Sequence, residues 1–222
     1  MMDKDNILKN LFEIIQECER FSFLIRDEEF QIQSITKLEQ IKKEVSKEKN
    51  IAITNQGERT ANIMLSAENV IEALVSELKM WIALKKREYD KAWDLLIEAQ
   101  SYLRNSYQAS TESGFNFDGY SNKLLFIEMT IFPKPMFMSP AMIIESTLCS
   151  ICNKNYDECD HIVGKAYMGR LCYQIVNKIK EMKGLAIVEQ PANKHARITN
   201  FTENGITRDI FTWKEIKEKD SN

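Results

Sequence analysis

The chain has 222 residues, of which 44% are hydrophobic and 28% are charged, and its formal net charge is −3. This composition is typical of a globular protein with one large or two modest domains, and it excludes a disordered or fibrous chain. Seven glycines and four prolines are too few for a turn-rich β-sandwich and favour long helices. No apolar run is long enough to cross a membrane. The N-terminus also lacks the layout of a secretion signal, so we expect a cytoplasmic protein.

Apolar residues recur every three or four positions through most of the first hundred residues, which is the spacing of one helical face. The pattern is interrupted over 50–57, where Asn55 and Gly57 favour a turn. Asp90 is placed to cap the last helix of this region. The sequence therefore predicts an N-terminal helical domain over residues 1–107.

Residues 108–148 are expected to form a linker followed by a proline- and methionine-rich extended segment. The linker is polar at its start, and the apolar run over 123–132 is consistent with one more short helix. Beyond it, Pro133, Pro135 and Pro140 favour extended backbone. The methionines here allow two interpretations: a strap across the helical core, which we favour, or an adaptable surface for a partner.

Four of the five cysteines lie within 24 residues, which in a reducing compartment indicates a metal site rather than disulfides. Cys149 and Cys152 have the Cys-x₂-Cys spacing of a tight turn, and Cys159 and His161 follow a short loop of turn-forming residues. Three thiolates and one imidazole make a common closed ligand shell for zinc. The sequence therefore predicts one structural Zn²⁺ ion bound by these four residues.

Cys172 is an alternative ligand, which would replace Cys159 if the site were treble-clef-like, with the Cys-x₂-Cys pair followed by a later ligand at the start of a helix. We prefer the set with Cys159 and His161, which leaves Cys172 as a buried residue on a helix over 173–183. A catalytic zinc ion needs an open position and a nearby base. The His-Glu-x-x-His and His-x-Glu motifs of zinc enzymes do not occur in the sequence, so we expect a structural ion.

The rest of the tail is predicted to form a small antiparallel sheet beside that helix, which would end at Gly184. Three strands are expected, over 185–192, 195–201 and 210–213. Asn204 and Gly205 form a strong hairpin dipeptide. The predicted fold class is therefore α+β: an N-terminal helical bundle followed by a zinc-binding module, residues 149–222, with one helix and an antiparallel β-sheet.

Residues 149–197 resemble short zinc-binding elements of uncharacterised bacterial and phage-encoded proteins. The resemblance rests on the sequences CSIC, CDH, HIVGKAYMG and PANKHARI, and it covers less than a quarter of the chain. It implies a zinc-stabilised unit and no particular activity. Within this segment Gly164 and Gly169 flank Tyr167, which predicts a turn that packs an aromatic ring under the metal loop.

The leading hypothesis is a non-enzymatic interaction or scaffolding subunit that binds another protein subunit, as an accessory component of a bacterial or phage-related multi-protein system. Residues 149–200 carry a net charge of +3, so a nucleic-acid-binding module is the alternative. Its candidate contacts are Lys178, Lys180, Lys194 and Arg197. A hydrolase with an unrecognised site is a third alternative, for which His195 is the remaining histidine. No membrane partner is expected.

Overall fold

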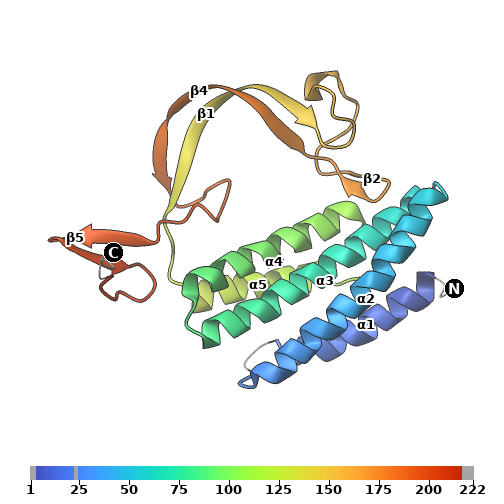
Figure 1. The fold of residues 1–222 in the computed structure, drawn as a ribbon, viewed down its shortest axis with the longest axis horizontal. Coiled ribbons are helices and arrows are strands. Elements are labelled where there is room, and N and C mark those ends of the chain that lie inside the picture. The colour runs from blue at the N-terminus through green and yellow to red at the C-terminus, as the bar shows by residue number, and fades with distance from the viewer. Residues whose placement is uncertain (1–3, 23–24, 217–222) are drawn as a thin grey trace, which may run out of the picture.

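The computed structural model describes residues 4–22 and 25–216. Within those residues five α-helices come first, and six strands follow that pair with antiparallel neighbours (Figure 1). The helices are α1 (Lys4–Glu19), α2 (Glu28–Thr54), α3 (Glu58–Lys85), α4 (Tyr89–Ala109) and α5 (Phe117–Ile131). Helices and strands occupy separate parts of the chain, so the fold is α+β, as the sequence predicts.

The central element of the helical part is α3, which contacts both α2 and α4. Most of its residues are buried, because a helix with neighbours on opposite sides presents apolar side chains around most of its circumference. Leu74 and Leu78 of α3 and Trp93 and Leu96 of α4 are at most 1% exposed. Helix α1 packs on α2, and α5 packs on α4.

The observed helix boundaries differ locally from the predicted ones. Helix α2 continues through Asn50 to Thr54, and the turn forms at Asn55 to Gly57, where the Gly57 amide donates to the Ala52 carbonyl at 2.8 Å. Asp90 is not the N-cap of α4, because the cap is Glu88 and Asp90 lies inside the first turn. Helix α5 begins six residues before the apolar run that predicts it.

A buried polar cluster joins α5 to α3. Glu77 of α3 is fully buried and accepts hydrogen bonds from the Tyr120 hydroxyl at 2.8 Å and the Trp81 indole at 3.3 Å. Lys123 of α5 forms an ion pair with the same carboxylate at 2.8 Å. Burial raises the pKa of Tyr120 well above its usual value, and the nearby Glu77 charge raises this pKa further.

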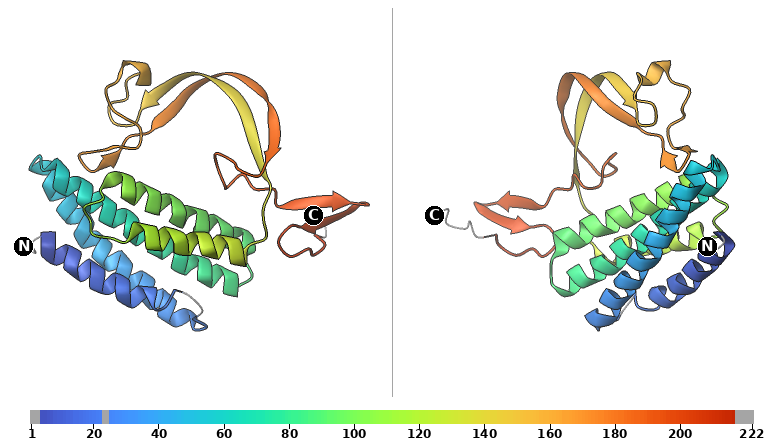
Figure 2. Two further views of the ribbon diagram at one scale, coloured as in Figure 1. Left: turned by 180° about the vertical axis from the view of Figure 1, so that it is seen from behind. Right: turned by 45° about the vertical axis from the view of Figure 1, so that its right-hand side comes forward.

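The longest strands, β1 (Phe137–Cys149) and β4 (Gln174–Val188), form a two-stranded antiparallel ribbon. Figures 1 and 2 show this β1–β4 ribbon curving over α4, with the chain returning to the helices at the β2 end. The helix predicted over 173–183 is therefore wrong, because these residues belong almost entirely to β4. Gly184 lies inside the same strand and ends no helix.

The remaining strands are short: β2 (Ala166–Tyr167), β3 (Arg170–Leu171), β5 (Asn200–Glu203) and β6 (Ile206–Asp209). The hairpin predicted at Asn204 and Gly205 is confirmed, because both residues have positive φ and join β5 to β6. The strand predicted over 210–213 is wrong, since the Asp209 carboxylate accepts the amides of Phe211 and Thr212 and forms a turn there.

The other two predicted strands are only partly correct. Of residues 185–192, only those up to Val188 are in a strand, and they extend β4. Of residues 195–201, Asn200 and Phe201 belong to β5, and Arg197 makes an isolated bridge to Phe137.

An aromatic cluster attaches the base of the ribbon to the helices. The Trp93 ring of α4 lies 5.4 to 6.1 Å from the rings of Phe132, Phe137 and Phe211. Its indole N–H donates to the Lys194 carbonyl at 2.9 Å. The segment predicted as a strap across the core is buried at Phe132 and Phe137, but Met138 beyond them is exposed.

Candidate metal centre

Three cysteines and one histidine come together where β1 ends and the loop toward β2 begins. Cys149 is the last residue of β1, and Cys152 follows in a tight turn in which Asn153 adopts a positive φ. The Asn153 amide donates to the Cys149 carbonyl at 2.8 Å, and the Cys149 amide donates to the Lys154 carbonyl at 2.9 Å. These bonds fix the backbone so that both thiols of the Cys-x₂-Cys pair face one point.

The second pair of donors follows a single turn of 3₁₀-helix, Tyr156–Glu158. The Cys159 amide donates to the Tyr156 carbonyl at 3.2 Å, and the His161 amide donates to Cys159 Sγ at 3.2 Å. A bridge between Leu148 and Asn155 returns the loop toward β1. The short loop therefore brings Cys159 and His161 back to the Cys-x₂-Cys turn.

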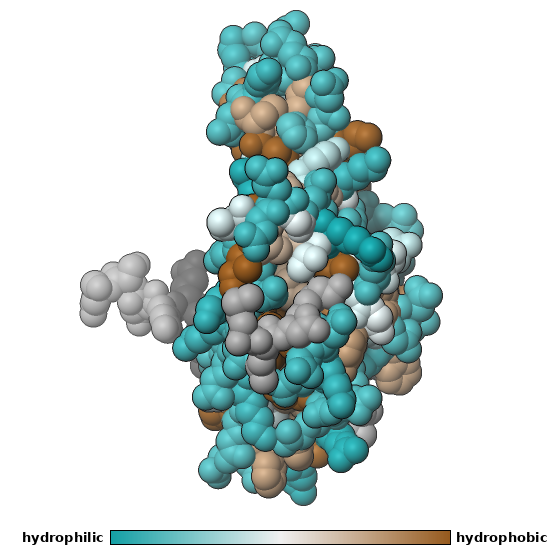
Figure 3. Space-filling view, turned by 90° about the vertical axis from the view of Figure 1, so that its right-hand side faces the viewer, coloured by the Kyte–Doolittle hydropathy of each residue, from teal (hydrophilic) through white to brown (hydrophobic). Residues whose placement is uncertain are grey.

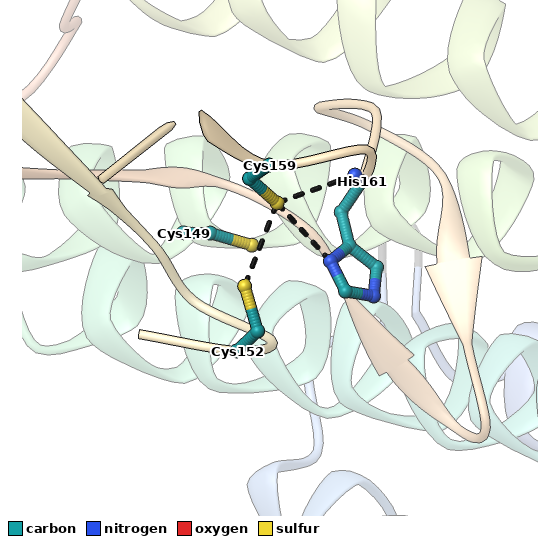
Figure 4. A group of neighbouring side chains, drawn as sticks. All are labelled: Cys149, Cys152, Cys159 and His161. Atoms are coloured by element: carbon teal, nitrogen blue, oxygen red, sulfur yellow. Dashed lines mark hydrogen bonds between the residues drawn. The ribbon is translucent and has the colours of Figure 1, made fainter. Parts of the chain in front are cut away.

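The four side chains converge on one centre (Figure 4). Their ligand atoms all lie within 4.8 Å of one another. Cys152 Sγ and Cys159 Sγ are 3.5 Å apart, and Cys159 Sγ is 3.2 Å from His161 Nδ1. Zinc–sulfur bonds of about 2.3 Å in a tetrahedron place two sulfurs about 3.8 Å apart. The four-donor group of Cys149, Cys152, Cys159 and His161 thus has the composition and the spacing that a tetrahedral metal ion requires.

The thiols of this group differ in acidity. Burial raises the pKa of Cys149, but hydrogen bonds from the Cys152 and Ile151 amides and from neighbouring thiols outweigh burial and lower this pKa to about 6. Burial and the neighbouring Cys149 and Cys152 raise the pKa of Cys159 to about 11, although the His161 amide opposes them. Cys149 is therefore more acidic than Cys159, and a bound cation would displace the proton of Cys159.

Two tyrosines hold the loop around the group. The Tyr167 ring meets the His161 ring edge-on, with centroids 4.7 Å apart, and its hydroxyl accepts the Ile162 amide at 2.9 Å. The Tyr156 hydroxyl accepts the Val163 amide at 3.1 Å. The predicted packing of an aromatic ring under the metal loop is confirmed at Tyr167.

Cys172 lies close to the site but outside the four-donor group. Its Sγ atom is 3.8 Å from Cys149 Sγ, and the residue is 2% exposed. It sits between β3 and β4 rather than on a helix, and its amide donates to the Lys165 carbonyl at 2.9 Å. The structure thus places the Cys172 thiol beside that of Cys149 and outside the four-donor group.

The metal loop is attached to the helices by residues that the sequence analysis did not identify. The Asn62 side chain of α3 donates to the Ala166 carbonyl at 3.2 Å and accepts the Gly169 amide at 2.8 Å. Gly169 has a φ of +72°, and a Cβ atom there would meet the side chains of Ile53 and Lys49 of α2 at 3.2 to 3.3 Å. No sequence motif marks Asn62, because its function depends on a contact between distant segments.

The cations proposed as nucleic-acid contacts are mostly paired with carboxylates. Lys178 pairs with Glu145 at 2.9 Å, and Lys194 pairs with Glu128 at 2.7 Å. Arg197 is 8% exposed and pairs with Asp90. For Lys180 the described residues provide no ion pair. The structure therefore does not gather these four residues into one free basic surface.

His195, the histidine outside the metal group, lies with its Nδ1 atom 3.1 Å from the Asp94 carboxylate. The pair joins the loop before β5 to α4, and both side chains are exposed.

Comparison of the chain with family models, curated protein sequences and solved structures finds no match. In the part of the chain that the structure describes, no helix has the length and hydropathy that crossing a membrane requires.

Proposed function

We propose that this protein is a non-enzymatic zinc-binding interaction or scaffolding subunit. The observation that carries the proposal is the four-donor group at the end of β1. Three thiolates and one imidazole complete a tetrahedral zinc shell, so a zinc ion held by all four has no position left for an activated water. Zinc here would hold the loop in shape and would supply no nucleophile.

Soft thiolate donors favour zinc over magnesium or calcium, which prefer oxygen ligands. The loop contains few apolar residues that are fully buried, so its shape depends on the ion more than on a core of its own. The pairing of Lys178, Lys194 and Arg197 with carboxylates supports a protein partner over a polyanion. The setting in a bacterial or phage-related assembly rests on the sequence resemblance alone.

Elemental analysis of the purified chain tests the metal. We expect about one zinc ion per chain, the stoichiometry of a closed site with four ligands. Cys152→Ser should lose the ion, because it removes one of four donors. Cys18→Ala should keep it, since Cys18 lies in α1, away from the group. A protein free of zinc, or one whose zinc carries a bound water in X-ray absorption spectra, would contradict the proposal.

The interaction is tested by isolating the tagged chain from its native host beside Cys152→Ser and Cys18→Ala. We expect partner proteins to accompany the wild type and Cys18→Ala, and to be lost with Cys152→Ser. Nuclease treatment that removes every companion would instead support the nucleic-acid alternative.

A further inference from the structure

The β1–β4 ribbon has one face made of apolar cross-strand pairs. Residues directly opposite each other in an antiparallel pair project to the same face, and alternate positions along a strand share a face. The pairs at alternate positions of β1 are Met138 with Ile187, Pro140 with Leu185, Met142 with Met182, and Ile144 with Ile179. We call these eight residues the apolar face, and it contains no charged or hydrogen-bonding side chain.

Two irregularities in the pairing preserve this face. If the register set by the pair of Met138 and Ile187 continued unchanged along the ribbon, Lys183 would lie opposite Met142 and Glu181 would lie opposite Ile144. Instead, the register shifts twice between Ala141 and Ile144, leaving Lys183 and Lys180 as extra residues of β4, so that Met182 and Ile179 take those places. The bulges therefore keep charges out of a face that would otherwise carry two.

The rest of the described chain leaves this face uncovered. At the base of the ribbon, Phe137 and its partner Val188 pack on the helical core, so the adjacent pair of Met138 and Ile187 lies on the opposite face. Six large side chains of the apolar face are between 42 and 65% exposed. They are Met138, Ile144, Ile179, Met182, Leu185 and Ile187. Figure 3 shows hydrophobic surface among hydrophilic groups on the narrow upper part of the molecule.

We infer that the apolar face binds the same face of a second copy of this chain, related by a two-fold axis. Each of the six side chains has roughly 100 Å² of solvent-exposed area, so the face exposes about 600 Å² of apolar surface. This is the upper end of the range for the largest apolar patch of a typical monomer. A standard interface buries about 800 Å² per partner. Two such faces in contact bury up to about 600 Å² per partner, so the residues that flank them need to add only about 200 Å² each to reach the area of a standard interface.

Charge favours a second copy over a different partner. Four of the charged residues that flank the face are paired within the ribbon, Lys178 with Glu145 and Lys183 with Glu181, and Lys180 is the flanking cation for which the described residues provide no ion pair. A face without charge, whose border is mostly paired, offers little to steer a charged partner, but it complements itself. A two-stranded ribbon is also marginally stable alone, and stacking two ribbons gives each one a buried side.

This inference rests on the proposed function and specifies its partner. Sedimentation equilibrium of the full zinc-loaded chain tests it, with a matched pair of variants. Ile144 and Ile143 are neighbours with 44 and 41% exposure, but they lie on opposite faces of the ribbon. Ile144→Lys places a charge in the apolar face of both copies, whereas Ile143→Lys places the same charge outside it.

We expect the wild type and Ile143→Lys to have twice the monomer mass of 25.9 kDa, and Ile144→Lys to associate about 100-fold more weakly. Leu185→Lys, at a more exposed position of the face, should repeat this result if Ile144→Lys does not fold. A monomeric wild type, or equal association of both variants, would overturn the inference. Zinc content measured on the same samples separates the two failures: a zinc-loaded monomer contradicts the dimer, and a metal-free chain contradicts the proposed function.

Discussion

Membership of the four-donor group distinguishes the roles of individual thiols at the metal centre. Both Cys172 and Cys159 lie near Cys149, but only Cys159 is within 4.8 Å of all other members of the four-donor group. We expect Cys172→Ser to weaken zinc binding by about tenfold, the effect of losing a contact outside the ligand shell. Cys159→Ser should lower the affinity much further, because it removes a ligand. Competition with a chromophoric chelator measures both affinities.

Cobalt substitution provides the complementary test of these two thiols. The absorption spectrum of tetrahedral cobalt depends on the number of its thiolate ligands. Cys172→Ser should therefore have the same spectrum as the wild type, and Cys159→Ser should have a different one. The opposite result, a changed spectrum in Cys172→Ser and an unchanged spectrum in Cys159→Ser, would establish Cys172 as a ligand in place of Cys159.

The raised pKa of Tyr120 predicts how the stability of the helical part depends on pH. Burial and the Glu77 charge raise its pKa, so the folded protein keeps the hydroxyl protonated where the unfolded chain ionises. The stabilising contribution is complete below the unfolded pKa of about 10 and is lost as pH rises toward the folded pKa. The free energy of unfolding should therefore fall by about 1.4 kcal/mol per pH unit above pH 10.

Urea unfolding followed by circular dichroism measures this slope. Tyr120→Phe should make this slope shallower and should cost about 1–2 kcal/mol at pH 7, since Glu77 loses one hydrogen bond. Tyr107→Phe is the control, because Tyr107 is exposed and should leave the slope unchanged. An identical slope in Tyr120→Phe and the wild type would show that other groups cause the loss.

At the same scale, the convergence of the four candidate donors could be predicted because their chemistry is visible in their spacing. Cys149, Cys152, Cys159 and His161 lie within thirteen residues, and few roles other than metal binding need that set. The attachment of the loop through Asn62 could not be predicted, because an asparagine inside a helix has no distinctive pattern and its partners are more than 100 residues away.

The element that sequence reasoning misjudged is β4, and its bulges explain why. The apolar face uses Ile179, Met182, Leu185 and Ile187, and each bulge adds one residue between two of these positions. The spacing of two that marks a strand thereby becomes three, which imitates a helical face. The long helices were predictable because their periodicity is uninterrupted, whereas a bulged strand reveals its period only through its partner strand.

The turn between β2 and β3 provides a test at the level of elements. Gly169 and Gly205 both have positive φ, but a Cβ atom at Gly169 would press on α2 while one at Gly205 would meet open space. Gly205→Ala should cost about 1 kcal/mol from backbone strain alone. Gly169→Ala should cost about 2 kcal/mol or more, because the new Cβ atom adds the same backbone strain and also pushes the turn away from Lys49 and Ile53.

Hydrogen exchange locates the two effects. In Gly169→Ala the amide of residue 169, which donates to Asn62, should exchange faster, together with the amides of the metal loop. In Gly205→Ala faster exchange should be confined to β5 and β6. Unchanged protection at residue 169 in the first variant would mean that the turn does not depend on its contact with α2.

At the scale of the whole molecule, the two parts of the chain are stabilised by different means. The helices bury a continuous cluster that includes Leu38, Leu74 and Trp93. The β1–β4 ribbon is exposed along nearly all of β4 and is attached to the helices at its aromatic base and through the metal loop. Loss of an ion bound by the four-donor group should therefore act on one of these two attachments and leave the helical core intact.

After chelation, one part of the molecule should consequently lose its protection from hydrogen exchange, and the other part should keep it. The metal loop has no apolar core large enough to replace four metal bonds, and structural zinc typically contributes on the order of 10 kcal/mol to the folding of such units. We expect hydrogen exchange after chelation to lose protection over residues 149–172 and at the adjoining ends of β1 and β4. Protection in α2, α3 and α4 should remain, because Leu74, Leu78 and Leu96 pack without any contribution from the loop.

Readdition of zinc to the chelated protein should restore the original exchange pattern, and Cys152→Ser should show the chelated pattern from the start, since it lacks one donor. Cys18→Ala should respond to chelation as the wild type does. If α2 and α3 lost protection together with the loop, the docking of Gly169 on Asn62 would have to stabilise the helices as well as the metal loop. The helical core would then depend on the ion, and the two parts would fold as one cooperative unit.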